Sequence, residues 1–396
     1  MTKAWSASNK KSFFLLKRNS EPEIGFTTGT CAACASIAAV RMLLSKKNVP
    51  YVFFTTPKGI KILVEIRNQI FTETYASCSV KKIAGNDPDV TDGIEIFSHV
   101  KKKPFVEGDS AGKEKRDFQI EIDGGFGVGR VTLPGLDQKP GMAAINSVPR
   151  KMILEGIKAE LKKEKCSADD FGISVEISVP EGEKVAEKTF NPKLGIFGGI
   201  SILGTSGIVE PMSEQAILDT IQVEINVRKA QGYKILPMVP GNYGADFLSE
   251  NFSFSVESAV HTSNFIYDSL KMAEKSGFRK IIFCGHIGKL VKVAGGIRNT
   301  HSKYGDHRME ILCDIAKEFF PGEDFSPLRG RLMACISTEQ AVNVLDELDE
   351  NHLIRQKIMT ELARRVHEQM CQWTDGKIEI EIVLFTKEKG CLARWK

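Results

Sequence analysis

The second half of the chain repeats one order of elements three times: an apolar strand, a glycine-containing loop and a helix. We expect the strands at 194–203, 234–239 and 279–284, followed by the loops GTSG, PGNYG and GHIG. Two strands joined by a crossover helix lie parallel in one sheet, so this order predicts an α/β fold with a mostly parallel sheet. Ligands bind outside the carboxyl ends of such strands, and the glycine loops are therefore expected to converge along one edge.

The first half has a different pattern, with several strands and few helices. Apolar runs at 51–56 and 60–66 flank a Pro-Lys-Gly turn, which predicts a hairpin. Further strands are expected at 94–100, 118–122 and 172–179. The Pro- and Glu-rich segment VPEGEKVAEKTFNP then suggests a boundary. We predict an α+β domain over 1–190 and an α/β, Rossmann-like domain over 191–396.

A Thr- and Gly-rich segment, GFTTGT, precedes a helix that is expected to begin near Cys31, with Thr30 as its N-cap. Free N–H groups and hydroxyls at a helix start favour anions, so this segment is a candidate ligand contact. The alternative is a plain capped helix without a ligand.

The stretch 281–310 is rich in cations and histidines. It contains Lys289, Lys292, Arg298, Lys303 and Arg308, with His286, His301 and His307 among them. Such a group can engage several carboxylates or phosphates together, which predicts an anion-rich ligand. The alternative is an ordinary basic surface around a turn.

Composition narrows the class of protein. The 396 residues are 42% apolar and 26% charged, as in soluble globular proteins, and the net charge of +4 does not suggest a nucleic-acid binder. No run approaches membrane-spanning length, and the apolar stretch 13–16 is too short for a signal peptide. Nine scattered cysteines indicate reduced thiols and a cytoplasmic protein; Cys31 and Cys34 are interpreted as packed helix residues, with a metal or redox pair as the alternative.

Several catalytic motifs are absent from the sequence. It contains neither the phosphate-binding loop G-x-x-x-x-G-K-[ST] nor a G-x-S-x-G nucleophile elbow, and the glycines of GGFGVGR precede a strand-like run where a dinucleotide loop would open a helix. Kinase, hydrolase and ordinary dehydrogenase functions therefore lose their main support.

Longer segments, in order along the chain, resemble one family. They are GFTTGTCAACASIAA, AGNDPDVTDG, GVGRVTLPGLDQKPGMAAINSVPR, PEGEKVAEKTFNPKLGIFGGISILGTSGIVEPMSEQA, PGNYG and GHIGKLVKVAGGIRNTHSKYGDHRME. Together they are similar to the CbiD family, the cobalt-precorrin-5B C1-methyltransferases of anaerobic cobalamin biosynthesis. The resemblance implies S-adenosylmethionine as methyl donor and a corrinoid as acceptor, methylated at ring carbon C1 to give cobalt-precorrin-6A. Cobalt would belong to the substrate, and no protein metal site is implied.

With this resemblance we assign residue roles as hypotheses. The donor is expected at Gly204, Thr205, Ser206, Gly207, Gly241 and Asn242. The corrinoid carboxylates are expected at His286, Lys289, Lys292, Asn299, Thr300, His301 and Arg308, with Thr27, Thr28 and Thr30 closing the site. The sequence assigns no catalytic acid or base. It leaves room for a homo-oligomer, and it predicts neither nucleic acid nor membrane as a partner.

Two other classes of function stay open at this point. A non-catalytic tetrapyrrole carrier would bind corrinoid but not the methyl donor. A nucleotide-phosphate enzyme would use the same glycine loops and respond to magnesium and nucleoside triphosphate.

Overall fold

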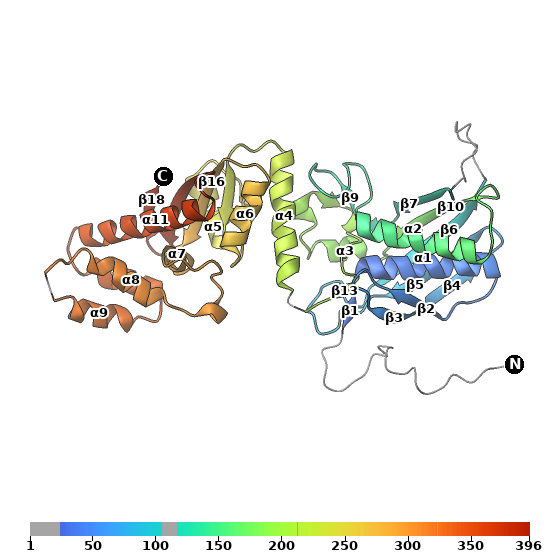
Figure 1. The fold of residues 1–396 in the computed structure, drawn as a ribbon, viewed down its shortest axis with the longest axis horizontal. Coiled ribbons are helices and arrows are strands. Elements are labelled where there is room, and N and C mark those ends of the chain that lie inside the picture. Colours follow the sequence, from blue (N-terminus) through green and yellow to red (C-terminus); the bar gives the residue numbers. More distant parts are fainter. Residues whose placement is uncertain (1–23, 105–116, 212, 323) are drawn as a thin grey trace. The chain divides into compact units, whose positions relative to one another are not determined.

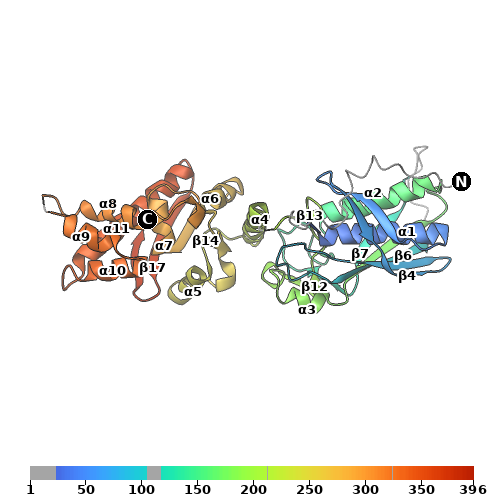
Figure 2. The same cartoon turned by 90° about the horizontal axis from the view of Figure 1, so that it is seen from below.

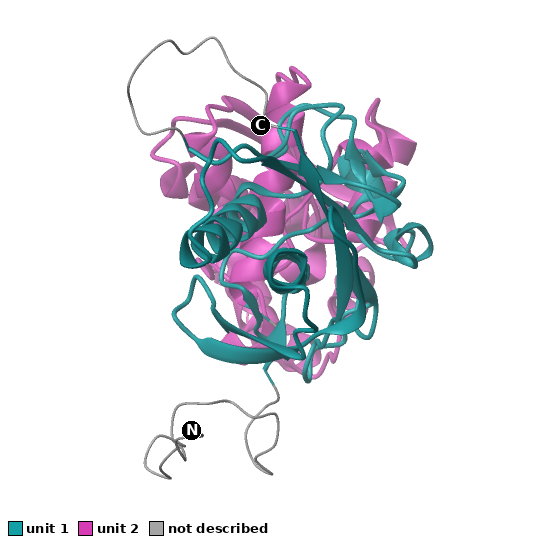
Figure 3. Ribbon diagram, turned by 90° about the vertical axis from the view of Figure 1, so that its right-hand side faces the viewer, with its two compact units in different colours: residues 1–213 teal, residues 214–396 magenta. Residues whose placement is uncertain are grey.

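The computed structural model describes residues 24–104, 117–211, 213–322 and 324–396. The chain forms two compact units, Met1–Ser213 and Glu214–Lys396, coloured separately in Figure 3. Both contain helices and strands, so the protein is of mixed α/β class. The division falls later than the predicted boundary at 190, because the segment that follows 190 pairs with strands of unit 1.

Unit 1 is built on a five-stranded sheet of order β4-β5-β6-β10-β7. Its strands are β4 (Arg67–Phe71), β5 (Tyr75–Lys81), β6 (Glu95–Lys103), β10 (Gly172–Ser178) and β7 (Ile120–Gly124). Neighbours are antiparallel except β10 and β7, which are parallel. The predicted hairpin is confirmed, since β2 (Tyr51–Thr55) pairs antiparallel with β3 (Lys61–Glu65).

Two helices, α1 (Thr28–Ser45) and α2 (Ser147–Lys163), lie side by side in unit 1 (Figure 1). Alanine and cysteine dominate the start of α1, and such small side chains let α2, β5 and β6 approach closely. By length and composition α1 could span a membrane, which corrects the expectation that no run approaches that length. In the described residues, however, 83% of that helix is buried, so it forms the core of unit 1.

The predicted strand at 194–203 is wrong as a member of the parallel sheet. The segment forms two short strands, β11 (Ile196–Phe197) and β12 (Gly199–Ile200), which pair with β9 (Arg130–Val131) and β8 (Gly127–Val128) of unit 1. Its continuation β13 (Ile208–Val209) pairs with β1 (Gly25–Phe26). The remaining short elements are α3 (Gly182–Ala186) and a 3-10 turn at Pro192–Leu194.

Unit 2 contains a second five-stranded sheet, of order β15-β14-β16-β17-β18. Its strands are β15 (Val260–His261), β14 (Leu236–Val239), β16 (Lys280–His286), β17 (Glu379–Thr386) and β18 (Gly390–Trp395). All neighbours are parallel except the edge strand β18. The parallel pairing of the predicted strands at 234–239 and 279–284 is confirmed.

The two faces of this sheet are covered by different helices. Along β16, Ile281 and Phe283 enter the large core formed with α6, α7 and α11, whereas Ile282 and Cys284 enter a smaller core with α5. Figure 2 shows α5 and α6 on opposite sides of β14. The helices of unit 2 are α4 (Glu214–Ala230), α5 (Asn242–Asn251), α6 (Ile266–Lys275), α7 (Ile287–Ala294), α8 (Arg308–Lys317), α9 (Ser326–Met333), α10 (Thr338–Asp346) and α11 (Leu353–Trp373), with 3-10 turns at Val256–Ser258 and Ser302–Tyr304.

Candidate functional site

The strand order of unit 2 defines where a ligand is expected. From β14 the chain crosses through α5 to β15 on one side, whereas from β16 it crosses to β17 on the other side. The neighbouring strands β14 and β16 therefore form the point where the direction of the connections reverses. In open parallel sheets, ligands bind in the crevice outside the carboxyl ends of such a pair. The loops that follow β14 and β16 are the candidate site, and we call this region the carboxyl edge.

The loop after β14 leaves open space at Gly241. This residue caps α5 with extended backbone, and a Cβ built on it would meet no atom of the described part of the chain within 4 Å. The next two side chains, Asn242 and Tyr243, are exposed. Lys387, which follows β17, places its Nζ 3.3 Å from the centre of the Tyr243 ring. Tyr243 and Lys387 were not among the residues predicted from the sequence, although Tyr243 stands inside the PGNYG motif.

His286 ends β16 and caps α7. Its Nδ1 accepts the Gly288 N–H at 3.1 Å, and its Nε2 lies 2.6 Å from Glu339 Oε1. Because Nδ1 is an acceptor, a neutral ring carries its proton on Nε2 and donates it to the carboxylate. Glu339 lies 53 positions away in the sequence and was missed. Ser337 and Gln340 beside it form a capping-box pattern, which predicts a helix start and gives no sign of the contact with His286.

The two lysines predicted to grip corrinoid carboxylates hold backbone instead. Lys289 Nζ donates to Pro240 O at 3.1 Å and to Ser263 O at 3.2 Å, tying α7 to the ends of β14 and β15. Burial lowers the pKa of Lys289 below its ordinary value, and the nearby charge of Lys292 acts in the same direction. Lys292 is only 6% exposed and donates to Thr300 O and to the carbonyl of Gly305.

The three other cations of this stretch also have partners within unit 2. Arg298 lies over the Tyr267 ring, 4.4 Å from its centre, while Lys303 pairs with Glu214 and Arg308 with Asp306. The hydrogen bond from Arg308 is the main cause that holds the pKa of the Asp306 carboxyl below its usual range. Exposed pairs of this kind contribute little stability, so a ligand carboxylate can compete for the cation.

The polar residues of the same stretch shape its turn. Asn299 Oδ1 accepts the His301 N–H at 3.0 Å, and His301 Nδ1 accepts the Lys303 N–H at 3.1 Å. Thr300 is buried and bonds through its N–H and its hydroxyl to Asn264, which follows β15. The side chain of His301 is exposed and can reach a ligand, whereas the buried Thr300 stabilises the loop through its bonds to Asn264.

The predicted site residues of unit 1 form a separate internal junction. Thr30 Oγ1 donates to Gly207 O at 2.6 Å, Thr28 Oγ1 accepts the Leu203 N–H at 2.9 Å, and Thr27 Oγ1 accepts the Thr30 N–H. The hydroxyls expected to face an anion are thus engaged by the chain. Gly204–Gly207 were expected to follow a strand of the parallel sheet, and this expectation is wrong, because β13 and the bonds to α1 hold the loop within unit 1.

The neighbouring motif AGNDPDVTDG is organised around a buried cation. Lys82 is 2% exposed, and its Nζ lies 2.5 Å from Asp89 Oδ2. Asp89 Oδ1 accepts both the N–H and the hydroxyl of Thr91. Asp92 Oδ1 accepts the Ala84 N–H at 2.7 Å. The acidic side chains therefore fix the loop.

The C-x-x-C pair behaves as the packing interpretation predicts. Cys31 and Cys34 are fully buried in α1, and burial raises the pKa of Cys31 to about 12. Within the described ranges, no group of three His, Cys, Asp or Glu side chains is placed to hold a metal ion.

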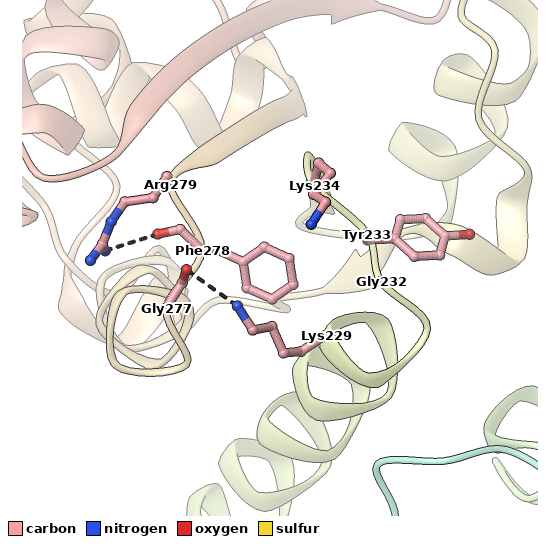
Figure 4. A pocket seen from close by; sticks show the side chains of 7 residues that line it. All are labelled: Lys229, Gly232, Tyr233, Lys234, Gly277, Phe278 and Arg279. Carbon is pink, nitrogen blue, oxygen red and sulfur yellow. Dashed lines mark hydrogen bonds between the residues drawn. The ribbon is translucent and has the colours of Figure 1, made fainter.

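A hollow of about 230 Å³ lies at the opposite end of the second sheet (Figure 4). It is lined by Lys229, Gly232, Tyr233, Lys234, Gly277, Phe278 and Arg279, which precede the amino ends of β14 and β16. The hollow is therefore separate from the carboxyl edge, where the sheet topology places a ligand.

Comparison with known proteins assigns the family. A model described as CbiD matches residues 16–211, and one described as CbiD, C-terminal domain, matches residues 299–396. The cobalt-precorrin-5B C(1)-methyltransferase of Ruminiclostridium cellulolyticum is 40% identical over 379 residues, covering 94% of this chain and 91% of that protein. The protein of the same name from Thermoanaerobacter sp. is 39% identical and covers 96% of this chain and 97% of that protein.

A crystal structure of a cobalamin biosynthesis protein (cbiD) from Archaeoglobus fulgidus is 28% identical, spans 69% of this chain and 80% of that one, and has a TM-score of 0.36. The sequence relatives are similar over nearly the entire length. This chain therefore belongs to the CbiD family.

Proposed function

We propose that this protein transfers a methyl group from S-adenosylmethionine to ring carbon C1 of cobalt-precorrin-5B, giving cobalt-precorrin-6A in anaerobic cobalamin biosynthesis. Relatives named cobalt-precorrin-5B C(1)-methyltransferase match nearly the whole chain. The structural observation that supports a donor site is the open, glycine-started helix beside His286 at the carboxyl edge. Free cysteine thiols throughout the chain fit a cytoplasmic enzyme.

We place the donor at the Rossmann-like sheet of unit 2. S-adenosylmethionine carries a carboxylate, an ammonium, a sulfonium and a ribose diol, so it needs both hydrogen-bond donors and acceptors. Gly241 leaves space for a ligand to approach the start of α5, and Asn242 offers an exposed amide. Glu339, held by His286, supplies an acceptor. These groups fit the donor, which supplies an electrophilic methyl group when bound.

We place the carboxylates of the corrinoid, which accepts the methyl group, at the solvent-exposed side chains that follow α7. His301 is exposed and Arg308 is partly exposed, with Asn299 in the same turn. Arg308 can exchange its exposed partner Asp306 for a ligand carboxylate. Lys289 and Lys292 contribute indirectly by fixing the loops that carry these residues. The cobalt ion belongs to the corrinoid substrate.

The reaction depends mainly on how the protein positions the methyl donor and the accepting carbon. Transfer of a methyl group from a sulfonium requires the accepting carbon to lie in line with the methyl and sulfur atoms, without water between them. The ties from Lys289 to Pro240 and Ser263 provide a rigid edge for this purpose. We assign no general base.

The direct test is incubation of the full chain with cobalt-precorrin-5B and methyl-labelled S-adenosylmethionine, followed by mass and position analysis of the product. We expect one labelled methyl group at C1. Corrinoid binding without donor binding or transfer would identify a carrier. Turnover of nucleoside triphosphate with magnesium, and no methyl transfer, would identify a nucleotide-phosphate enzyme.

A further inference from the structure

Glu339 presents a fixed carboxylate at the carboxyl edge. It lies in the first turn of α10, and Oε1 accepts the Nε2–H of His286 at 2.6 Å. Among the residues that the structure describes, Oε2 receives a bond only from Thr338 Oγ1, at 3.5 Å, which is the limit of a hydrogen bond. Both His286 and Glu339 have side chains that are 27% exposed. Oε1 is therefore held by His286, while Oε2 can still accept a hydrogen bond from a ligand.

An exposed apolar side chain stands three residues before this carboxylate. Ile336 is 81% exposed, the highest value among the exposed large hydrophobic residues of the described chain. Its N–H donates to Gln340 Oε1 at 2.9 Å, and Ser337 Oγ accepts the Gln340 N–H, so the start of α10 is fixed. Ile336 stands directly before Ser337, the N-cap of α10, and so lies three positions from Glu339 along the chain.

We propose that Ile336 and Glu339 form the nucleoside subsite for the methyl donor, with Glu339 accepting hydrogen bonds from the ribose diol and Ile336 packing against the adenine face. The inference rests on the proposed function, because it names the part of S-adenosylmethionine that this edge recognises. An exposed isoleucine alone needs no explanation, and a single carboxylate has many uses. Glu339 is bonded to His286 at the end of β16, and Ile336 lies just before the start of the same helix, so together they offer the acceptor and the apolar surface that a nucleoside requires.

Charge favours the donor over the acceptor at this position. The corrinoid carries carboxylates, which the Glu339 carboxylate repels, whereas the donor carries a diol and positive charge. His286 is a positioning residue here, since its Nε2–H fixes which oxygen of Glu339 remains available. The same bond predicts the effect of Glu339→Gln: the oxygen of the new amide would face His286, and its NH2 would face the diol.

The test is calorimetric titration of the full chain with S-adenosylmethionine, S-adenosylhomocysteine and the 2′-deoxy analogue of S-adenosylhomocysteine. A site built on hydroxyl recognition rejects an analogue that lacks the hydroxyl, so we expect the parent chain to prefer the ribo ligand by about 10- to 100-fold. Glu339→Gln should weaken donor binding by a similar factor and reduce the ribo preference to about twofold or less. Ile336→Ser should weaken ribo and deoxy ligands alike, by roughly three- to tenfold.

Glu350→Gln is the matched control, because it removes an exposed carboxylate of the same unit outside this edge. It should leave affinities and the ribo preference unchanged, and thermal melts should show that all variants fold. An unchanged ribo preference in Glu339→Gln would overturn the subsite, as would absence of that preference in the parent chain. Failure of the parent chain to bind any donor ligand or to transfer methyl would instead overturn the proposed function.

Discussion

Two glycine loops that look alike in sequence serve different purposes in the two units. In GTSG of unit 1, Gly204 and Gly207 have φ of 130° and 81°, and a Cβ on Gly204 would lie 2.3 Å from Thr27 Oγ1. In PGNYG of unit 2, Gly241 has extended backbone and a Cβ there would meet open space. Gly204 is required by the packing of its own unit, whereas nothing in the fold of unit 2 excludes a side chain at Gly241.

The comparison shows how to separate structural from functional glycines. A glycine with a left-handed backbone and a crowded Cβ position is explained by the fold. A glycine with ordinary backbone and free space, such as Gly241 or Gly330, is not required by the fold, and for Gly241 we propose a ligand near the start of α5. The same distinction separates the charged side chains. Lys82 in unit 1 is buried and paired with Asp89, whereas Glu339 in unit 2 can still accept a hydrogen bond.

The largest expected effect comes from placing a methyl group on Gly204. Gly204→Ala combines a disfavoured backbone with a clash on Thr27, so we expect it to lower the free energy of unfolding by about 4 kcal/mol. Gly241→Ala should cost less than about 1 kcal/mol but weaken donor binding. Urea unfolding and donor titration of both variants check this contrast. Equal losses of stability would remove the distinction between the loops.

The next effect concerns the buried cation of unit 1. Lys82→Met leaves Asp89 without its partner and should cost about 3 kcal/mol. Burial favours the neutral form of Asp89, but the bonds from Lys82 and Thr91 outweigh it and hold the pKa below the usual range.

A lowered pKa in the folded state has a defined consequence for pH. The stabilisation is present above the unfolded value of about 4 and is lost as pH falls through the folded value. Unfolding between pH 3 and 7 should therefore show a steeper acid loss in the parent chain than in Lys82→Met. Parallel pH profiles would contradict a stabilising role for the pair.

The arrangement of strands and helices in unit 2 could be predicted from the sequence more fully than the contacts of individual side chains. Strands β14 and β16 each contain a short continuous apolar run, so their place in a parallel sheet could be inferred. Val260–His261 was missed because a two-residue strand has no periodicity. The segment at 194–203 has the same apolar pattern as a sheet strand, and its pairing with Gly127–Val128 and Arg130–Val131 reveals that it belongs to unit 1.

The candidate site was less predictable, for physical reasons. A lysine in a basic stretch gives no sign of whether its ammonium faces solvent or a carbonyl, and Lys289 and Lys292 proved to face carbonyls. The contact between His286 and Glu339 joins residues far apart in the chain, so no local sequence pattern predicts it. The proximity of Gly241 and Lys289 follows from parallel topology, which the alternation of strands and helices did predict.

A smaller effect is expected for Lys289, which ties three elements of the carboxyl edge. Lys289→Ala removes two bonds from a charged donor, so we expect a stability loss of about 2 kcal/mol. Because Pro240 precedes Gly241, donor affinity should fall about tenfold, with corrinoid affinity changing less. Titration of both ligands measures the ratio. Loss of corrinoid affinity with unchanged donor affinity would contradict this role and support the original assignment of Lys289 to the corrinoid site.

The smallest effect on stability is expected for Arg308. Its pair with Asp306 is exposed, so Arg308→Ala should change the free energy of unfolding by less than about 0.5 kcal/mol. Corrinoid affinity should fall several-fold and become less dependent on salt. Lys317→Ala, at the other end of α8, is the control and should change neither. Identical salt dependence in Arg308→Ala and the parent chain would exclude Arg308 from the acceptor site.

Photo-crosslinking tests most directly whether the carboxyl edge of unit 2 binds the donor. Labelled S-adenosylmethionine is irradiated with the full chain, and the modified peptides are identified by mass spectrometry. We predict crosslinks in the peptides that contain Gly241–Tyr243 and Ile336–Glu339. Crosslinks confined to Thr27–Thr30 and Gly204–Gly207 would contradict this placement of the donor.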